Sequence, residues 1–163
     1  MNEKLVKAFN DQIQAEFYSA YMYYAMSLHC AEKNKKGMAR WLKVQYEEER
    51  AHAMRLISHL EDRGQTVKLM QIDQPHIATE SFLAIFEQSL EHEKYVTKRI
   101  HDMYALAIEE KDYAAQIHLN WFIDEQVEEE SVFSEIVDKM KLIGDSTIGM
   151  FQMDAELGRR VAD

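Results

Sequence analysis

The chain has 163 residues, of which 47% are hydrophobic and 29% are charged, and its formal net charge is −10. This length fits a single domain, 1–163, with a sizeable core, and the balance of apolar and charged residues excludes a disordered chain. The acidic excess argues against a nucleic-acid partner, because phosphate backbones are bound by basic patches, and it is compatible with binding cations.

Five helical segments are expected along the chain, because one proline and five glycines leave few positions that break a helix. Thr79, just before Glu80, is the expected N-cap of the third segment, and Ser146 is the expected cap of the fifth. The only proline lies in a long non-periodic connection, Gly64–Ala78. The expected helices cover about 2–33, 37–63, 79–110, 113–143 and 146–157.

The lengths of the connections set the expected topology. Short joints after the first and third helices predict two antiparallel helical hairpins. A helix of about 28 residues is ~42 Å long and about 15 extended residues reach ~50 Å, so the middle connection can run the length of the bundle. We therefore predict an all-α four-helix bundle with one long crossover between the second and third helices, plus a short fifth helix. The rival is an up-down-up-down bundle whose middle loop packs at one end.

The same sequence carries signals about the compartment. No apolar run approaches the ~20 residues that a membrane span needs, so no membrane partner is expected. The N-terminal stretch MNEKLVKAFNDQ lacks the apolar segment of a signal peptide. The single cysteine, Cys30, can form no internal disulfide, which favours a reducing compartment. We expect a cytoplasmic protein.

Each of the four long helices carries a carboxylate on its apolar stripe, traced in steps of three and four residues. In the stretch YEEERAH the stripe passes through Glu49 and His52, which lie three residues apart and so project from one face. The polar residues of interest on the four stripes are, in chain order, Glu16 with Tyr23, Glu49 with His52, Glu93, and Gln126 with Glu129.

Four carboxylates at similar heights in a bundle core need a compensating charge. Without a cation they would repel one another and take up protons. The stripes offer no lysine or arginine to neutralise them, whereas two divalent cations balance four ionised glutamates directly. Carboxylate oxygens are hard ligands, and one imidazole adds affinity for iron, manganese or zinc. The pattern indicates a two-metal site in the core; the alternative is a structural polar core.

With these residues on four helices, the chain resembles bacterial non-haem ferritins over essentially its whole length. The motifs that carry the resemblance are Glu16 with Tyr23, EEERAH, LEHEKYVTK and DEQVEEE. A Glu-x-x-His pair alone is common in di-iron bundles, but the full set on four helices in this order is specific. The resemblance also implies a short fifth helix, which matches the segment after Gly144.

The resemblance implies a di-iron ferroxidase centre within each subunit. In that family the residues matching Glu16, Glu49 and His52 hold the first iron, and Glu49 bridges to the second. Glu93 and Glu129 would complete the second iron site. Gln126 would lie beside the second iron and position oxygen or water, and Tyr23 would hydrogen-bond within the centre and act as an electron donor. A third, looser iron site is implied at Glu48, Glu125 and Glu128, which would share Glu129; solvent-facing charges are the alternative.

Three differences from neighbouring families narrow the choice of family. Many di-iron bundles carry a second Glu-x-x-His on the fourth helix, where this chain has Gln126-x-x-Glu129. Bacterioferritins place a haem-ligating methionine directly after the glutamate of the second helix. Here that position is Arg50, so no haem is expected. Rubrerythrins add paired Cys-x-x-Cys motifs, which one cysteine cannot supply.

The function that the resemblance implies is iron storage with ferroxidase activity. Two Fe(II) ions per subunit would be oxidised to Fe(III) by O2 or H2O2 and stored as a ferric mineral inside a homo-oligomeric shell of 24 subunits. Two alternatives stay open. One is a di-iron oxidase or peroxidase that stores no iron, and the other is a helical assembly module that binds no metal.

Overall fold

The computed structural model describes residues 1–161, and it contains five helices and no strand within them. Among these residues, no helix combines the length and the apolar character that a membrane crossing requires. The helices are α1 (Glu3–Glu32), α2 (Lys36–Asp62), α3 (Phe82–Glu109), α4 (Tyr113–Ile143) and α5 (Thr147–Leu157).

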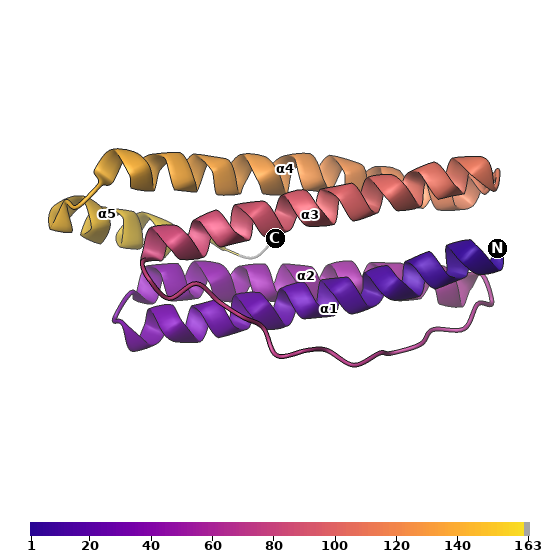
Figure 1. The fold of residues 1–163 in the computed structure, drawn as a ribbon, viewed down its shortest axis with the longest axis horizontal. Helices are drawn as coiled ribbons and strands as arrows, with labels where there is room; N and C mark the ends of the chain where they lie inside the picture. Colours follow the sequence, from indigo (N-terminus) through magenta and orange to yellow (C-terminus); the bar gives the residue numbers. More distant parts are fainter. Residues whose placement is uncertain (162–163) are drawn as a thin grey trace.

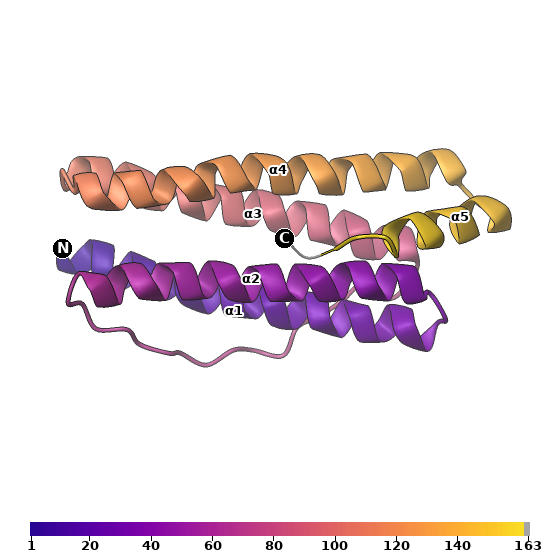
Figure 2. The same cartoon turned by 180° about the vertical axis from the view of Figure 1, so that it is seen from behind.

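The four long helices form one bundle, built from two antiparallel hairpins (Figure 1). The hairpins are α1 with α2 and α3 with α4, and α5 lies at one end of the bundle, between α2 and α4. The connection after α2 runs back along the length of the bundle before α3 begins, so α2 and α3 point the same way (Figure 2). The predicted crossover is confirmed, and the up-down-up-down alternative is wrong.

The crossover lies along the bundle because two helices bind its backbone. The side-chain amide of Asn10 donates to the carbonyl of Thr66 at 3.1 Å, and the Asn10 Oδ1 accepts from Lys68 N at 2.6 Å. Further along, Gln88 on α3 donates to the His76 carbonyl at 2.7 Å and accepts from Ala78 N at 2.6 Å. A loop without regular structure thereby satisfies part of its backbone hydrogen bonding.

The prediction that Thr79 caps the third helix is wrong. The helix begins at Phe82, and Ser81 is the cap: its hydroxyl accepts a hydrogen bond from Ala84 N at 3.0 Å. Both residues can cap a helix, and only Ser81 has its oxygen within reach of a free backbone N–H of the first turn. The predicted cap of the fifth helix is confirmed, because Ser146 Oγ accepts from Gly149 N at 3.1 Å.

The core has two apolar clusters with a polar layer between them. One cluster lies toward the N-terminal end of α1 and includes Phe9, Ile13 and Leu56. The other lies toward α5 and includes Met26 and Phe133. Dispersion and apolar burial hold both ends of the bundle together, which leaves the middle layer to be explained by its own chemistry.

Candidate metal centre

The polar layer between the two clusters consists of the side chains that the sequence singled out. Helical spacing explains why they meet, since residues three or four apart project from one face and each long helix presents that face to the core. Each of them is at most 5% exposed. They are Glu16 and Tyr23 from α1, Glu49 and His52 from α2, Glu93 from α3, and Gln126 and Glu129 from α4.

One half of the layer is a compact group of Glu16, Glu49 and His52. Their ligand atoms all lie within 4.8 Å of one another. His52 Nδ1 lies 3.5 Å from Glu49 Oε2, and Gln12 donates to Glu16 Oε1 at 2.8 Å. The second oxygen of Glu16 is buried and has no hydrogen-bond partner. A buried carboxylate oxygen without a partner carries a large desolvation cost, so this atom is where a bound cation would be most favourable.

Hydrogen bonds position Glu93 in the other half of the layer. The Tyr23 hydroxyl donates to Glu93 Oε1, and the Gln126 side-chain amide lies 3.2 Å from both Glu93 Oε2 and the Glu93 carbonyl. These two donors fix the orientation of the Glu93 carboxylate. Tyr23 and Gln126 therefore contact the same carboxylate, Tyr23 from α1 and Gln126 from α4.

A single amide joins Glu49 to the last of the four carboxylates, Glu129. Gln45 Nε2 lies 3.0 Å from Glu49 Oε1 and 2.9 Å from both oxygens of Glu129. The amide thereby connects α2 to α4 at the level of the layer. An amide donor reduces the repulsion between two carboxylates without removing their charge.

Burial raises the pKa of every carboxyl group in the layer. It is the main cause at Glu16, Glu49 and Glu129, and at Glu93 burial and the neighbouring Glu49 charge raise the pKa to about 8. Burial has the opposite effect on His52, because its charged form is the protonated one. Burial lowers its pKa, but the contacts with Glu125 and Glu49 outweigh burial and raise that pKa to about 12. The metal-free layer thus holds extra protons on its carboxyl groups and a positive charge on His52.

The residues of the layer fit a pair of divalent cations. Four carboxylates and one imidazole converge, one carboxylate oxygen is left without a partner, and no lysine or arginine is buried among residues 1–161. Oxygen donors with a single nitrogen donor suit first-row divalent metals such as iron, manganese and zinc. Metal binding would displace the protons that the carboxyl groups hold.

A pocket of about 280 Å³ opens beside His52, between α2 and α4. His52 Nε2 lies 3.6 Å from Glu125 Oε1, and the ligand atoms of His52, Glu125 and Glu129 lie within 4.8 Å of one another. We call this the outer carboxylate pocket, and its charged lining residues are Glu48, His52, Glu125, Glu128, Glu129 and Arg160. It gathers the three acids proposed for a third iron, but Glu48 is paired with Arg160.

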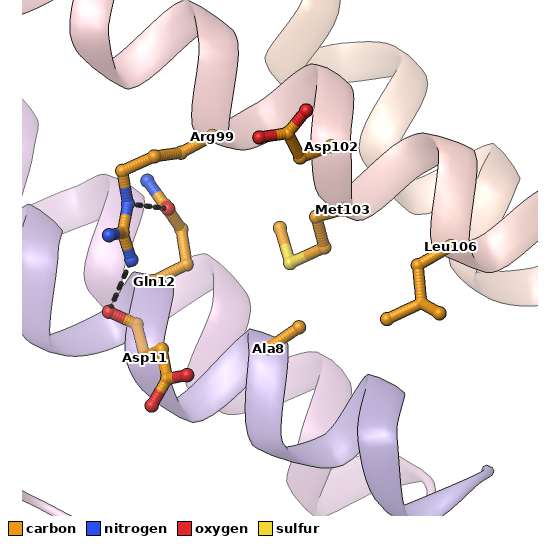
Figure 3. Close-up of a pocket in the computed structure, with 7 residues that line it drawn as sticks. All are labelled: Ala8, Asp11, Gln12, Arg99, Asp102, Met103 and Leu106. Atoms are coloured by element: carbon orange, nitrogen blue, oxygen red, sulfur yellow. Dashed lines mark hydrogen bonds between the residues drawn. The ribbon is translucent and has the colours of Figure 1, made fainter.

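Sequence reasoning missed the polar residues that support the layer from outside. Figure 3 shows one such group, in a groove between α1 and α3: Arg99 Nε donates to Gln12 Oε1 at 2.8 Å, and Arg99 Nη2 donates to the Asp11 carbonyl at 2.9 Å. Gln12 in turn donates to Glu16. Gln12 lies four residues before Glu16, a spacing that the sequence could have revealed. Arg99 and Arg160 lie far from their partners in the chain and left no such signal.

Comparison with known proteins places these features in a family context. A family model described as "Ferritin-like domain" matches residues 6–143. The bacterial non-heme ferritin of Staphylococcus aureus (strain USA300) is 36% identical over 163 residues, which cover 100% of this chain and 98% of that protein. A probable bacterial non-heme ferritin-like protein of Haemophilus influenzae is 37% identical over 158 residues, covering 97% of this chain and 96% of that protein.

The solved structures that this chain resembles are also ferritins. An engineered closed form of the Archaeoglobus fulgidus ferritin matches with a TM-score of 0.98 and 42% identity, covering 100% of this chain and 99% of that chain. An open-pore ferritin from the same archaeon matches with a TM-score of 0.97 and 42% identity, covering 99% of both chains. The similarity therefore extends over the whole bundle and α5.

Proposed function

The chain belongs to the ferritin-like domain family, and on that premise we propose that it is an iron-storage protein with ferroxidase activity. The observation that carries the proposal is the buried layer of four carboxylates and one imidazole, with an unpartnered oxygen on Glu16. Fe(II) is the substrate, O2 or H2O2 is the oxidant, and Fe(III) is the product. The product would be stored as a mineral inside a shell of copies of this chain.

The proposed ligands divide between two iron positions. Glu16, Glu49 and His52, whose ligand atoms already lie within 4.8 Å of one another, would hold the first iron. Glu93 and Glu129 would hold the second iron, and Glu49 would be a ligand of both irons. The second position has no histidine, so it is the more purely oxygen-donating of the two, and oxygen donors favour the harder Fe(III) ion.

The other residues of the layer would position these ligands. Gln45 holds Glu49 and Glu129, Gln126 and Tyr23 hold Glu93, and Gln12 holds Glu16. Such outer hydrogen bonds orient the ligands before metal arrives. Burial raises the pKa of Tyr23, which keeps its hydroxyl protonated and donating to Glu93; we also propose it as an electron donor to the centre.

Each Fe(II) ion loses one electron, so a pair supplies the two electrons that reduce O2 to H2O2 or H2O2 to water. The protein's part is to place two ions together and to neutralise the charge that they gain. Storage requires a shell, and we propose a homo-oligomer of 24 subunits with an acidic chain charge of −10 per copy. No haem is part of this proposal.

The experiment that tests this function measures Fe(II) oxidation by O2 in wild-type protein and in Glu49→Gln. Glu49 is the ligand proposed to bridge both ions, so its loss should remove the fast phase of oxidation. The matched control is Glu47→Gln, an exposed glutamate two residues away that pairs with Arg50. Loss of the fast phase in Glu49→Gln alone supports the function, and equal rates in all three proteins contradict it.

A further inference from the structure

Arg160 lies in the outer carboxylate pocket although it belongs to the segment after α5. Its Nη2 pairs with Glu48, and its Nη1 donates to Gln45 Oε1 at 2.9 Å. The guanidinium also stacks over the Trp41 ring at 4.0 Å from the ring centroid. Arg160 thus makes an ion pair, a hydrogen bond and a cation–π contact, all with residues of α2.

The charges of the pocket explain why a cation is favoured there. Glu48, Glu125, Glu128 and Glu129 all line it, and Arg160 is the one lysine or arginine among its lining residues. Arg160 therefore supplies positive charge where a metal ion would supply it. The guanidinium and a metal ion at Glu48 would compete for the same carboxylate.

The position of Arg160 in the chain allows it to leave the pocket. It follows the end of α5 at Leu157 by three residues, in a segment without regular structure. Its backbone carbonyl accepts a hydrogen bond from Arg40 Nε at 3.3 Å, so the backbone can stay in place while the side chain rotates away.

We propose that Arg160 is a tethered counter-ion that occupies the outer carboxylate pocket in the metal-free protein and is displaced when a divalent cation binds there. This inference rests on the proposed function and takes the cation to be a third Fe(II), in addition to the two ions of the buried layer. Without metal the arginine neutralises Glu48, and it sets a threshold for filling the third position. The di-iron positions would fill first, because their carboxylates have no arginine to displace.

Arg160 also connects the pocket to the di-iron layer. It holds the Gln45 oxygen, and the Gln45 amide nitrogen contacts Glu49 and Glu129. When the guanidinium leaves, the Gln45 oxygen loses its donor and the amide is free to turn. Occupation of the outer pocket would therefore change the hydrogen bonding of two ligands of the di-iron layer.

The test is an anaerobic titration of the assembled, full-length protein with Zn²⁺, and separately with Fe(II), followed calorimetrically. The variant is Arg160→Gln, and the matched control is Arg159→Gln, which removes the same charge from the neighbouring exposed residue. Even at the dielectric constant of water, a unit charge about 6 Å from a divalent ion weakens its binding by about tenfold. We expect the third equivalent to bind at least about tenfold more tightly in Arg160→Gln, and wild type and Arg159→Gln to agree.

A crystal of the wild-type protein soaked in Zn²⁺ gives an independent readout. Zinc bound at Glu48, with the Arg160 guanidinium turned away, supports the displacement; zinc bound there with the Arg160–Glu48 pair intact overturns it. An unchanged or weaker third equivalent in Arg160→Gln also overturns it, as does the absence of a third equivalent in all three proteins. The first two equivalents report on the proposed function separately, because they belong to the buried layer.

Discussion

At the scale of single residues, His52 has two different roles depending on whether metal is present. In the metal-free protein it is a cation between carboxylates, since contacts with Glu125 and Glu49 raise its pKa to about 12. As a metal ligand it must be neutral, because only the deprotonated nitrogen has a lone pair to donate. Iron binding should therefore release a proton from His52 in addition to those held by the carboxyl groups.

Replacing His52 by Ala should slow the fast phase of Fe(II) oxidation by about tenfold or more while leaving the shell assembled. The reason is that His52 is the one nitrogen ligand of the layer, and even residues that only orient a ligand are worth 10–100-fold. Stopped-flow measurement of oxidation checks this, with exposed His101→Ala on α3 as the control. An unchanged initial rate in His52→Ala would show that His52 is not a ligand of the centre.

The carboxyl groups of the layer set the pH dependence of the metal-free protein. Their pKa values are raised on folding, to about 8 at Glu93, and the pKa of His52 is raised as well. Between the unfolded and folded pKa values, the folded protein binds more protons than the unfolded chain. Its stability must therefore fall as the pH rises from about 5 to about 8.

The double variant Glu49→Gln, Glu93→Gln should be more stable than wild type without metal, by on the order of 3 kcal/mol at pH 8, and its stability should depend less on pH. The reason is that two carboxyl groups are gone whose ionised form is destabilised by burial and by the neighbouring carboxylates. Thermal melting of metal-free proteins across this pH range checks the prediction. The control is Glu47→Gln, Glu91→Gln, two exposed residues on the same helices. Equal stability and equal slopes would mean that the four carboxylates do not repel one another.

At the scale of helices, α5 docks on the start of α2 through a close backbone approach. Met38 N donates to Asp154 Oδ1 at 2.9 Å, and the neighbouring Gly37 has no side chain to interfere. A methyl group at Gly37 would lie 1.7 Å from the Asp154 carbonyl oxygen. Only glycine lets the two helices come this close. The contact fixes the position of α5, and therefore also where the next segment, which carries Arg160, begins.

Gly37→Ala should therefore loosen α5 and destabilise the protein by about 2 kcal/mol, the usual cost of overpacking. Hydrogen exchange of the α5 amides should speed up, and the thermal midpoint should fall. Lys36→Ala, an exposed change in the same turn of α2, serves as the control. If α5 exchanges equally slowly in Gly37→Ala and in wild type, the helix does not depend on this contact.

How far the sequence predicts the helices depends on how local the deciding interaction is. Steps of three and four residues from Gln126 and Glu129 follow the buried face of α4 from Leu119 to Met140, because such steps suffice for a helix buried on one face. The same steps taken back from Glu16 reach Val6 at the start of α1, whereas Val6 is half-buried and Leu5 is the fully buried residue. The first turn carries too few residues to fix the phase of a stripe, and the neighbouring helix decides it.

The candidate site shows the same limit. The four carboxylates and His52 could be found because each lies on its own helix's stripe. Gln45 lies on the stripe of α2 as well, four residues before Glu49, but the pattern alone gives an amide no role. Arg160 could not be found. Its contact with Glu48 joins residues 112 positions apart, and nothing in the local pattern of either residue encodes that pair.

At the scale of the whole molecule, large apolar side chains lie uncovered at the α4–α5 end of the single chain. Leu142, Ile148 and Phe151 are each at least 72% exposed. Large apolar side chains that are this exposed suit a surface that other subunits cover. The proposed shell would bury this end of the bundle against further copies of the chain.

The double variant Ile148→Glu, Phe151→Glu should therefore assemble into smaller particles than wild type. The charges would have to be buried without partners if the interface formed. Analytical ultracentrifugation checks the particle mass, and Gln152→Glu, an exposed polar position on the same helix, is the control. Full-size particles formed by the double variant would show that α5 faces solvent in the assembly.

The most direct test of the whole account is an anaerobic Fe(II) titration followed by admission of O2, with particle mass and iron content measured on the same sample. We predict that two Fe(II) ions per subunit bind tightly before oxygen is added and are oxidised in a fast phase afterwards. Further iron should then accumulate inside a particle with about 460 kDa of protein, which is 24 chains of 19.2 kDa. Binding of less than one ion per subunit, or ferric oxide that precipitates outside the particle, would contradict the account.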